Sequence, residues 1–148
     1  MEIEARGMTD VGCVRATNED AVLVREDLGL FVVADGIGGA AAGEVASGLF
    51  VDSCEEEFQS YSGWNEDYSL VISRCFNNAN TAIRNHTREH PETEGMGCTA
   101  EVLVLVNGQY YLGHVGDSRT YRWRNGAVDQ LTKDHSFVQE QIDLGLVE

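Results

Sequence analysis

The period of the hydrophobic pattern changes twice along the chain, and these changes limit the folds that it can adopt. Short alternating or apolar runs occupy the first 34 residues, helical spacing follows, and extended runs return from residue 98. Strands joined by short connections usually pair with their neighbours in sequence. The order therefore predicts an α+β fold with mostly antiparallel pairing, and it disfavours a doubly wound parallel sheet.

Turn residues predict where the strands pair. Asn107-Gly108 lies between the extended runs 98–106 and 109–115, and Asn125-Gly126 lies inside the run 119–131. Asn-Gly between two extended runs is the strongest short-range signal for a hairpin. Two hairpins are therefore expected in the second half of the chain.

The first half begins with further extended segments. Alternation over residues 2–6 predicts an opening strand, and residues 21–34 predict a hairpin whose second arm is apolar enough for the core. The glycine-rich stretch 35–39 is expected to form a tight loop.

Helices are expected where apolar residues recur every three or four positions, at residues 43–61, about 66–88 and 134–144. Asp134 or Ser136 would cap the last of these helices.

The charge of the chain is strongly negative, with 10 Lys and Arg residues, 25 Asp and Glu residues and a formal net charge of −15. Such a field repels nucleic acid and anionic membranes and attracts cations. Most of the acids are expected to form a solvated surface, and some of them could bind a metal ion.

The chain carries no recognisable targeting segment. Its N-terminus holds acids where a signal peptide needs basic residues, and no apolar run approaches the length of a membrane span. The cysteines are far apart and lie among apolar neighbours, which predicts buried, reduced thiols at Cys13, Cys54, Cys75 and Cys98. We therefore expect a single cytoplasmic domain over residues 1–148.

Short acidic motifs recur where a predicted strand meets a loop: Asn18-Glu19-Asp20, Asp35-Gly36, Gly116-Asp117-Ser118-Arg119 and Asp134-His135. A carboxylate followed by glycine can turn both its side chain and the next backbone carbonyl toward one ion. Mg²⁺ and Mn²⁺ prefer such oxygen ligands. Taken singly, each motif has a simpler interpretation: a turn, a surface cation at Arg119, or a helix cap at Asp134.

Together, these motifs resemble the metal-dependent protein serine/threonine phosphatases of the PPM, or type 2C, family, in its bacterial form. The matching stretches occur in order across nearly the whole chain: TDVGCVRATNEDA at 9–21, VADGIGGAAAGEVAS at 33–47, GCTAEVLVLV at 97–106, HVGDSRTY at 114–121 and LTKDHS at 131–136. The resemblance implies a four-layer α-β-β-α sandwich of two mainly antiparallel sheets flanked by helices.

The resemblance also implies a site with two Mn²⁺ or Mg²⁺ ions and a weaker third ion in some members. By position, Asp35 would bridge the two metals and Gly36 would offer its carbonyl. Glu19 would help to hold one metal, and Asp20 would support that shell. Asp117 would help to bind the third ion. The planar guanidinium of Arg15 would bind the substrate phosphate.

The implied reaction is hydrolysis of phosphoserine or phosphothreonine esters by attack of water bound to the dinuclear centre, with Arg15 and Asp35 as the catalytic residues. The substrates would be phosphorylated proteins, the targets of a serine/threonine kinase, which implies a signalling role. Cysteine-based phosphatase chemistry is disfavoured, because no cysteine precedes a phosphate-cradling loop.

The sequence departs from the family pattern in two ways. Ala40 stands where close members usually carry His, and no later Asp-Gly or Asp-Asn pair supplies the remaining metal ligands. We therefore expect residues 1–148 to represent an incomplete phosphatase domain without its C-terminal strands and flap, with weak or absent activity alone.

Two alternatives remain open. A catalytically dead binding module could use the acidic cleft to hold a phosphoprotein or another partner. A nucleotide-binding domain built on Gly36–Gly39 is disfavoured, since that loop lacks the Gly-Lys-Ser/Thr ending and the surrounding charge is negative.

Overall fold

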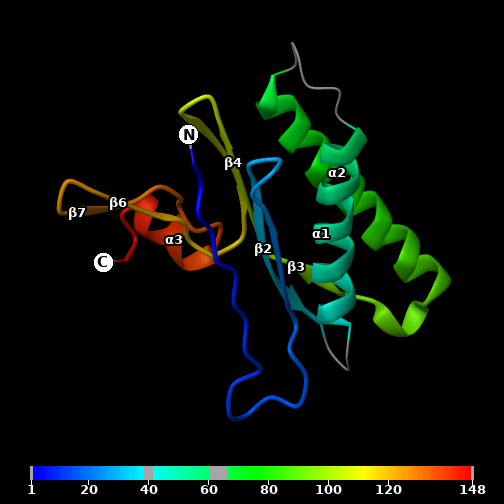
Figure 1. Ribbon diagram of the computed structural model, residues 1–148. Coiled ribbons are helices and arrows are strands. Elements are labelled where there is room, and N and C mark those ends of the chain that lie inside the picture. Colours follow the sequence, from blue (N-terminus) through cyan, green and yellow to red (C-terminus); the bar gives the residue numbers. More distant parts are fainter. Residues whose placement is uncertain (1, 39–41, 61–66, 148) are drawn as a thin grey trace.

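An antiparallel sheet lies at the centre of the computed structural model, which describes residues 2–38, 42–60 and 67–147 (Figure 1). In this described part of the chain the strand order is β1-β2-β4-β5. The strands are β1 (Asp20–Arg25), β2 (Leu30–Ile37), β4 (Ala100–Val106) and β5 (Gln109–Val115), and the short β3 (Gly97–Cys98) pairs with the end of β2. The predicted α+β class and antiparallel pairing are confirmed.

Both Asn-Gly hairpins form as the sequence predicts. Asn107 and Gly108 have φ values of 51° and 77° between β4 and β5. Asn125 and Gly126 have φ values of 52° and 81°, and they join β6 (Tyr121–Arg124) to β7 (Ala127–Gln130). Positive φ at both central residues is the type I′ geometry, whose twist matches that of the flanking strands. The β6–β7 hairpin forms a separate ribbon (Figure 1).

Two long helices, α1 (Gly43–Ser60) and α2 (Tyr68–Glu89), cover one face of the main sheet (Figure 1). A short 3-10 turn, η1 (Pro91–Thr93), follows α2. The last helix, α3 (Phe137–Asp143), begins after Ser136, whose hydroxyl accepts a hydrogen bond from the Gln139 amide. Of the two caps that the sequence allowed, Ser136 is therefore the one used.

The core lies between the main sheet and the two long helices. Its buried members come from β2, β4, α1 and α2: Leu30, Val32, Ala34, Phe50, Cys54, Phe58, Val71, Ile72, Cys75, Ala79, Ala100, Val102 and Val104. The Phe50 and Phe76 rings meet edge to face at 5.1 Å. Alternate residues of β2 and β4 point into this core, as the two-residue period of a strand requires.

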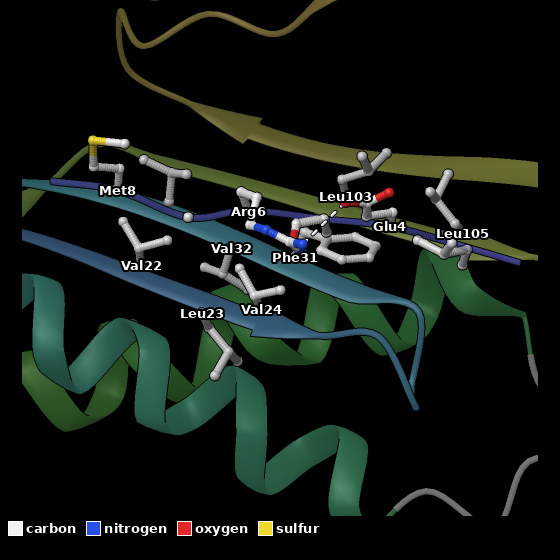
Figure 2. Close-up of a pocket in the computed structure, with 14 residues that line it drawn as sticks. Glu4, Arg6, Met8, Val22, Leu23, Val24, Phe31, Val32, Leu103 and Leu105 are labelled. Atoms are coloured by element: carbon white, nitrogen blue, oxygen red, sulfur yellow. Dashed lines mark hydrogen bonds and ion pairs between the residues drawn. The ribbon is translucent and has the colours of Figure 1, made fainter.

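The opposite, outer face of the main sheet is also apolar. The side chains of Phe31, Val33, Leu103 and Leu105 border a hollow of about 440 Å³, and residues 3–8 of the opening segment run across it (Figure 2). Asp35 lies on this same face, two residues after Val33 on β2 and beyond the apolar patch.

Three expectations are wrong. Residues 2–6 form no strand, because they lie against the outer face without a paired backbone ladder. Residues 35–37 are strand rather than loop, since Gly36 and Ile37 pair with β3. Of the four cysteines expected to be buried, Cys54 and Cys75 are buried in the core, Cys98 is only partly buried, and Cys13 is exposed in the opening segment.

No described helix combines the length and the apolar character needed to span a membrane.

Candidate functional site

The sheet register brings two of the predicted carboxylates face to face. Asp20, the first residue of β1, lies opposite Asp35 of β2. Residues directly opposite each other on antiparallel strands share a face, and like charges there repel. Burial raises the pKa of Asp35 above its ordinary value, and the negative charge of Asp20 raises it further.

Other predicted residues act on the same carboxyl group. The charges of Asp117 and Glu19 also raise the pKa of Asp35, while the guanidinium of Arg15 lowers it. Charges near a protein surface act strongly only at short range, because water and salt screen them. The sheet register and the bond from the Gly36 amide to the Glu19 carbonyl place Asp20 and Glu19 beside Asp35, and the contact of Ser118 with Thr99 brings the loop of Asp117 to the same end of the sheet.

A close backbone junction fixes Glu19 beside Asp35. The Glu19 carbonyl accepts hydrogen bonds from the Gly36 amide at 3.0 Å and from the buried Ser47 hydroxyl at 2.6 Å. A Cβ on Gly36 would lie 2.1 Å from the Gly43 carbonyl oxygen, and one on Gly43 would lie 2.9 Å from the Glu19 carboxyl carbon. The start of β1, the end of β2 and the start of α1 thus meet with no room for a side chain.

The opening segment forms the rim of a small acidic pocket of about 230 Å³. Its lining comprises Asp10, Val11, Arg15, Thr17, Asn18, Glu19, Asp20 and Asp35. Arg15 donates to the Glu19 carboxylate at 2.9 Å, and the Thr9 hydroxyl donates to the Asp20 carboxylate at 2.9 Å. Arg15 is two-thirds exposed, so its guanidinium is accessible to an anion from solvent.

Asp117 approaches from the loop after β5. Gly116 has a φ of 102°, and a Cβ on it would lie 2.7 Å from the Thr99 side chain, so this loop passes close to the β3–β4 junction. The neighbouring Ser118 hydroxyl lies 2.6 Å from the Thr99 hydroxyl. Asp117 itself is exposed and lies outside the lining of the acidic pocket.

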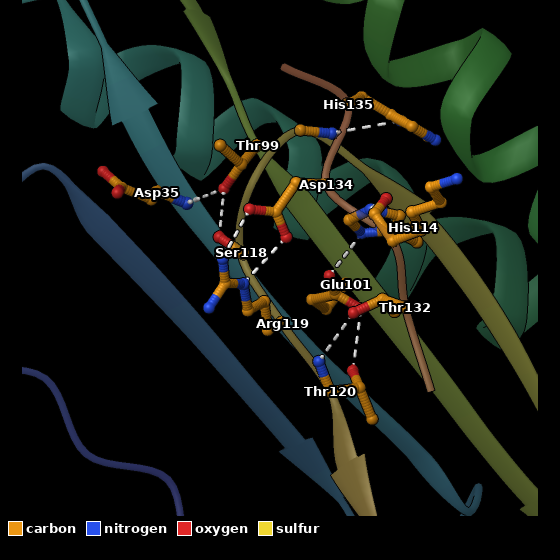
Figure 3. Close-up of polar contacts among 12 residues, drawn as sticks. Asp35, Thr99, Glu101, His114, Ser118, Arg119, Thr120, Thr132, Asp134 and His135 are labelled. Atoms are coloured by element: carbon orange, nitrogen blue, oxygen red, sulfur yellow. Dashed lines mark hydrogen bonds and ion pairs between the residues drawn. The ribbon is translucent and has the colours of Figure 1, made fainter. Parts of the chain in front are cut away.

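The segment that contains Asp134 and His135 holds this loop in place (Figure 3). Arg119 donates two hydrogen bonds to the Asp134 carboxylate, at 2.8 and 2.7 Å, and this pairing lowers the pKa of Asp134. The His135 amide donates to the Gly116 carbonyl at 2.7 Å. Arg119 is thus a paired cation, and Asp134 binds Arg119 instead of capping α3.

The predicted carboxylates share one region without meeting at a single point. Within residues 2–38, 42–60 and 67–147, no three His, Cys, Asp or Glu side chains are arranged to hold an ion. The donor set nevertheless suits a divalent cation, because the carboxylates of Asp10, Glu19, Asp20 and Asp35 line one pocket and are oxygen ligands of the kind that Mn²⁺ and Mg²⁺ prefer. Ala40 lies outside the described residues.

Several polar residues of this region could not be assigned from sequence. Thr9, Ser47 and Thr99 all lie within the matching stretches quoted above, but each bonds to a partner that only the folded chain brings near. Membership of those stretches was their only signal.

Comparison with known proteins identifies relatives of the chain. The sequence model of the family described as Protein phosphatase 2C matches residues 5–141. The serine/threonine protein phosphatase PstP of Mycobacterium tuberculosis is 37% identical over 139 residues, which cover 94% of this chain and 26% of PstP. The serine/threonine phosphatase stp of Listeria monocytogenes is 30% identical over 148 residues, covering 97% of this chain and 59% of stp.

Solved structures give the same relationship. The catalytic domain of PstP in complex with two manganese ions matches with a TM-score of 0.83 and 38% identity, over 92% of this chain and 57% of that one. A bacterial serine phosphatase matches with a TM-score of 0.85 and 29% identity, over 95% and 58%. The chain spans less than two thirds of the length of each of these relatives. The family match nevertheless extends over most of its residues, and the chain belongs to the protein phosphatase 2C family.

Proposed function

We propose that this chain carries the cation-binding and phosphate-binding part of a protein serine/threonine phosphatase that uses Mn²⁺ or Mg²⁺. The observation that carries the proposal is that the Glu19, Asp20 and Asp35 carboxylates line one small pocket together with Arg15. In a family whose relatives are serine/threonine phosphatases, one of them solved with two manganese ions, this acidic end of the sheet is the natural cation site.

Each acidic residue has a role in the proposed site. Asp35, which is partly buried, would bridge two cations, and Gly36 would offer its backbone carbonyl. Glu19 would hold one cation and Asp20 would support that shell, while Asp117, on its exposed loop, would belong to a weaker third position. Bound Mn²⁺ or Mg²⁺ would supply Lewis acidity that activates water and offsets charge on a phosphoryl group.

Arg15 binds the phosphate of the substrate. Its guanidinium is mostly exposed and lies within hydrogen-bonding reach of Glu19. Arg15 shares the Glu19 carboxylate with the proposed cation site, so its bond to Glu19 would weaken when that site is filled. Its planar guanidinium could then donate two hydrogen bonds to a phosphate. The substrates are phosphoserine and phosphothreonine side chains of proteins, the products of a serine/threonine kinase.

The proposal is tested by titrating the chain with MnCl₂ in a calorimeter. Replacing Asp35 by Asn removes the central charge with little change of shape, and we expect Mn²⁺ affinity to fall by at least about tenfold. Asp52→Asn is the matched control, since Asp52 is exposed on α1 and lies outside the cluster. Equal Mn²⁺ affinity in all three proteins, or no binding in any, would reject the proposed site.

Activity is tested on a phosphothreonine peptide in the presence of Mn²⁺. Phosphate release by the unchanged chain, which we expect to be weak, should exceed that of Asp35→Asn. Arg15→Ala should raise KM for the peptide without weakening Mn²⁺ binding, because it removes the cation that competes for the Glu19 carboxylate. Release that is independent of Mn²⁺ would contradict the assignment.

A second candidate is a binding module that holds phosphoproteins without hydrolysing them. It is favoured by the absence, among the described residues, of three acidic, His or Cys side chains meeting as a metal site. Ala40, at the position where close members usually carry His, points the same way. Phosphopeptide binding that persists without Mn²⁺, together with no turnover, would select this candidate.

A further inference from the structure

At Asp35, a side chain makes one of the hydrogen bonds that join β2 to the neighbouring segment. The sheet register pairs Val33 with Glu101 and Gly36 with Cys98, which places Thr99 opposite Asp35. The Thr99 amide donates to the Asp35 carbonyl at 2.8 Å, while the Asp35 amide donates to the Thr99 hydroxyl at 3.3 Å. In a regular antiparallel pair, both bonds join backbone groups. Here a hydroxyl takes over one of them, at the residue that carries the central carboxylate.

The same hydroxyl reaches the loop that carries Asp117. Thr99 Oγ1 lies 2.6 Å from Ser118 Oγ, and either hydroxyl can be the donor (Figure 3). Gly116 packs against the Thr99 side chain so closely that a Cβ there would lie 2.7 Å away. Thr99 is 7% exposed, so water competes little for these bonds. One buried side chain therefore touches both acidic segments.

The far side of the loop is held independently. Arg119 binds Asp134, and the His135 amide binds the Gly116 carbonyl. These bonds fix the loop to the following segment but make no contact with Asp35. The Thr99 hydroxyl links that assembly to β2.

We infer that Thr99 is a positioning residue that sets the relation between the Asp35 and Asp117 carboxylates, an inference that rests on the proposed function. The Thr99 hydroxyl bonds to the amide of Asp35 and to the hydroxyl of Ser118, the residue after Asp117, so it joins the two acidic segments directly. Without this link, the loop would keep its bonds to the following segment but lose its side-chain bond to the segment opposite Asp35. The buried hydroxyl thus fixes the loop of Asp117 relative to Asp35, so that a cation bound at Asp35 would have the Asp117 segment at a set position.

The test compares Thr99→Val, which keeps the shape and removes the hydroxyl, with Thr99→Ser, which keeps the hydroxyl. Mn²⁺ dissociation constants are measured by calorimetry on the full chain, and unfolding midpoints are measured in urea. Removing a group that orients metal ligands typically weakens metal binding by about 10–100-fold. We expect a loss of that size in Thr99→Val and an affinity close to that of the unchanged chain in Thr99→Ser.

Val102→Ala controls for general loss of stability. Val102 is fully buried on β4 and faces the helices, away from Asp35. It should lower the unfolding midpoint while leaving the Mn²⁺ affinity of the folded protein unchanged. If Val102→Ala weakens Mn²⁺ binding as much as Thr99→Val does, the effect reflects stability and the inference is overturned.

Ser118→Ala tests the link to the loop. It leaves the bond between Thr99 and Asp35 intact, so we expect a smaller loss than in Thr99→Val, and the two changes should be non-additive in the double variant. If the unchanged chain binds Mn²⁺ and Thr99→Val binds it equally well, the inference fails while the proposed function stands. If the unchanged chain binds no Mn²⁺, the proposed function and the inference both fail.

Discussion

At the scale of single residues, the site depends on backbone contacts that leave no room for side chains. Gly36 is the clearest case, since a Cβ there would overlap two carbonyl oxygens, at 2.1 Å from Gly43 and 2.6 Å from Glu19. Both of these neighbours are backbone atoms and cannot rotate away. The glycine after Asp35 is therefore required by packing, whereas the carbonyl proposed as a metal ligand could come from any residue.

Gly36→Ala should destabilise the chain by about 1–3 kcal/mol, the usual cost of forcing extra atoms into a packed site. Gly48→Ala is the matched control, because Gly48 lies within α1 and a Cβ there would meet nothing within 4 Å. Alanine is the better helix former, so this control should stabilise the chain by up to about 1 kcal/mol. Urea unfolding midpoints measure both changes, and shifts in the same direction would contradict the packing argument.

The identities of the acidic residues could be read from sequence, but their supports could not. Asp35, near the end of β2, and Asp117, just after β5, lie in recognisable motifs, so a location at one end of the sheet was predictable, while their roles as ligands stay predictions. Thr99 and Ser47 are ordinary hydroxyl residues in the sequence. Their importance depends on which backbone groups lie opposite them, and only the sheet register and the position of α1 determine that.

At the scale of elements, local sequence signals predicted the hairpins and the long helices but missed the pairing between strands that lie far apart in the sequence. Both Asn-Gly hairpins and both long helices were found because their signals lie within a few residues. The strand character of residues 35–37 was missed, since it comes from pairing with β3, about 60 residues away in sequence. The opening strand was predicted wrongly, because alternation at residues 2–6 reflects contact with the outer face.

The β6–β7 ribbon is attached to the main sheet through a buried carboxylate. Glu101 of β4 accepts from the Thr120 hydroxyl at 2.8 Å and bonds to the His114 ring at 2.5 Å, and the other ring nitrogen faces the Lys133 carbonyl at 2.9 Å (Figure 3). The Leu131 amide in turn donates to the Thr120 carbonyl at 2.8 Å. The base of the ribbon is thus held by side-chain bonds that converge on Glu101.

Glu101→Gln should loosen this attachment. It keeps the shape of the side chain but removes the charge, and hydrogen bonds to charged groups contribute about 1.5–3 kcal/mol. We expect faster amide hydrogen exchange in residues 121–130, with little change in β1 and β2. Asp129→Asn is the control, because its exposed pair with Arg122 lies within the ribbon and contributes little. Equal exchange in the two variants would show that Glu101 does not anchor the ribbon.

At the scale of the whole molecule, apolar surface and net charge act in opposite directions. The outer sheet face exposes Val33, and the ribbon and α3 expose Trp123 and Phe137. Large exposed apolar patches favour association. The formal net charge of −15 makes copies of the chain repel one another. Salt shortens the range of this repulsion, to about 10 Å at 0.1 M and about 3 Å at 1 M.

Self-association of the chain should therefore increase with salt. Sedimentation velocity at low and high NaCl should show a larger average mass at high salt, where the repulsion is screened and apolar contact remains. Val33→Glu places a charge on the outer face and should reduce this increase. Val14→Glu is the matched control, because Val14 is 96% exposed in the opening segment, away from that face. Association that falls with salt would identify charge pairing as its cause, and equal effects of the two substitutions would show that net charge, rather than the outer face, controls it.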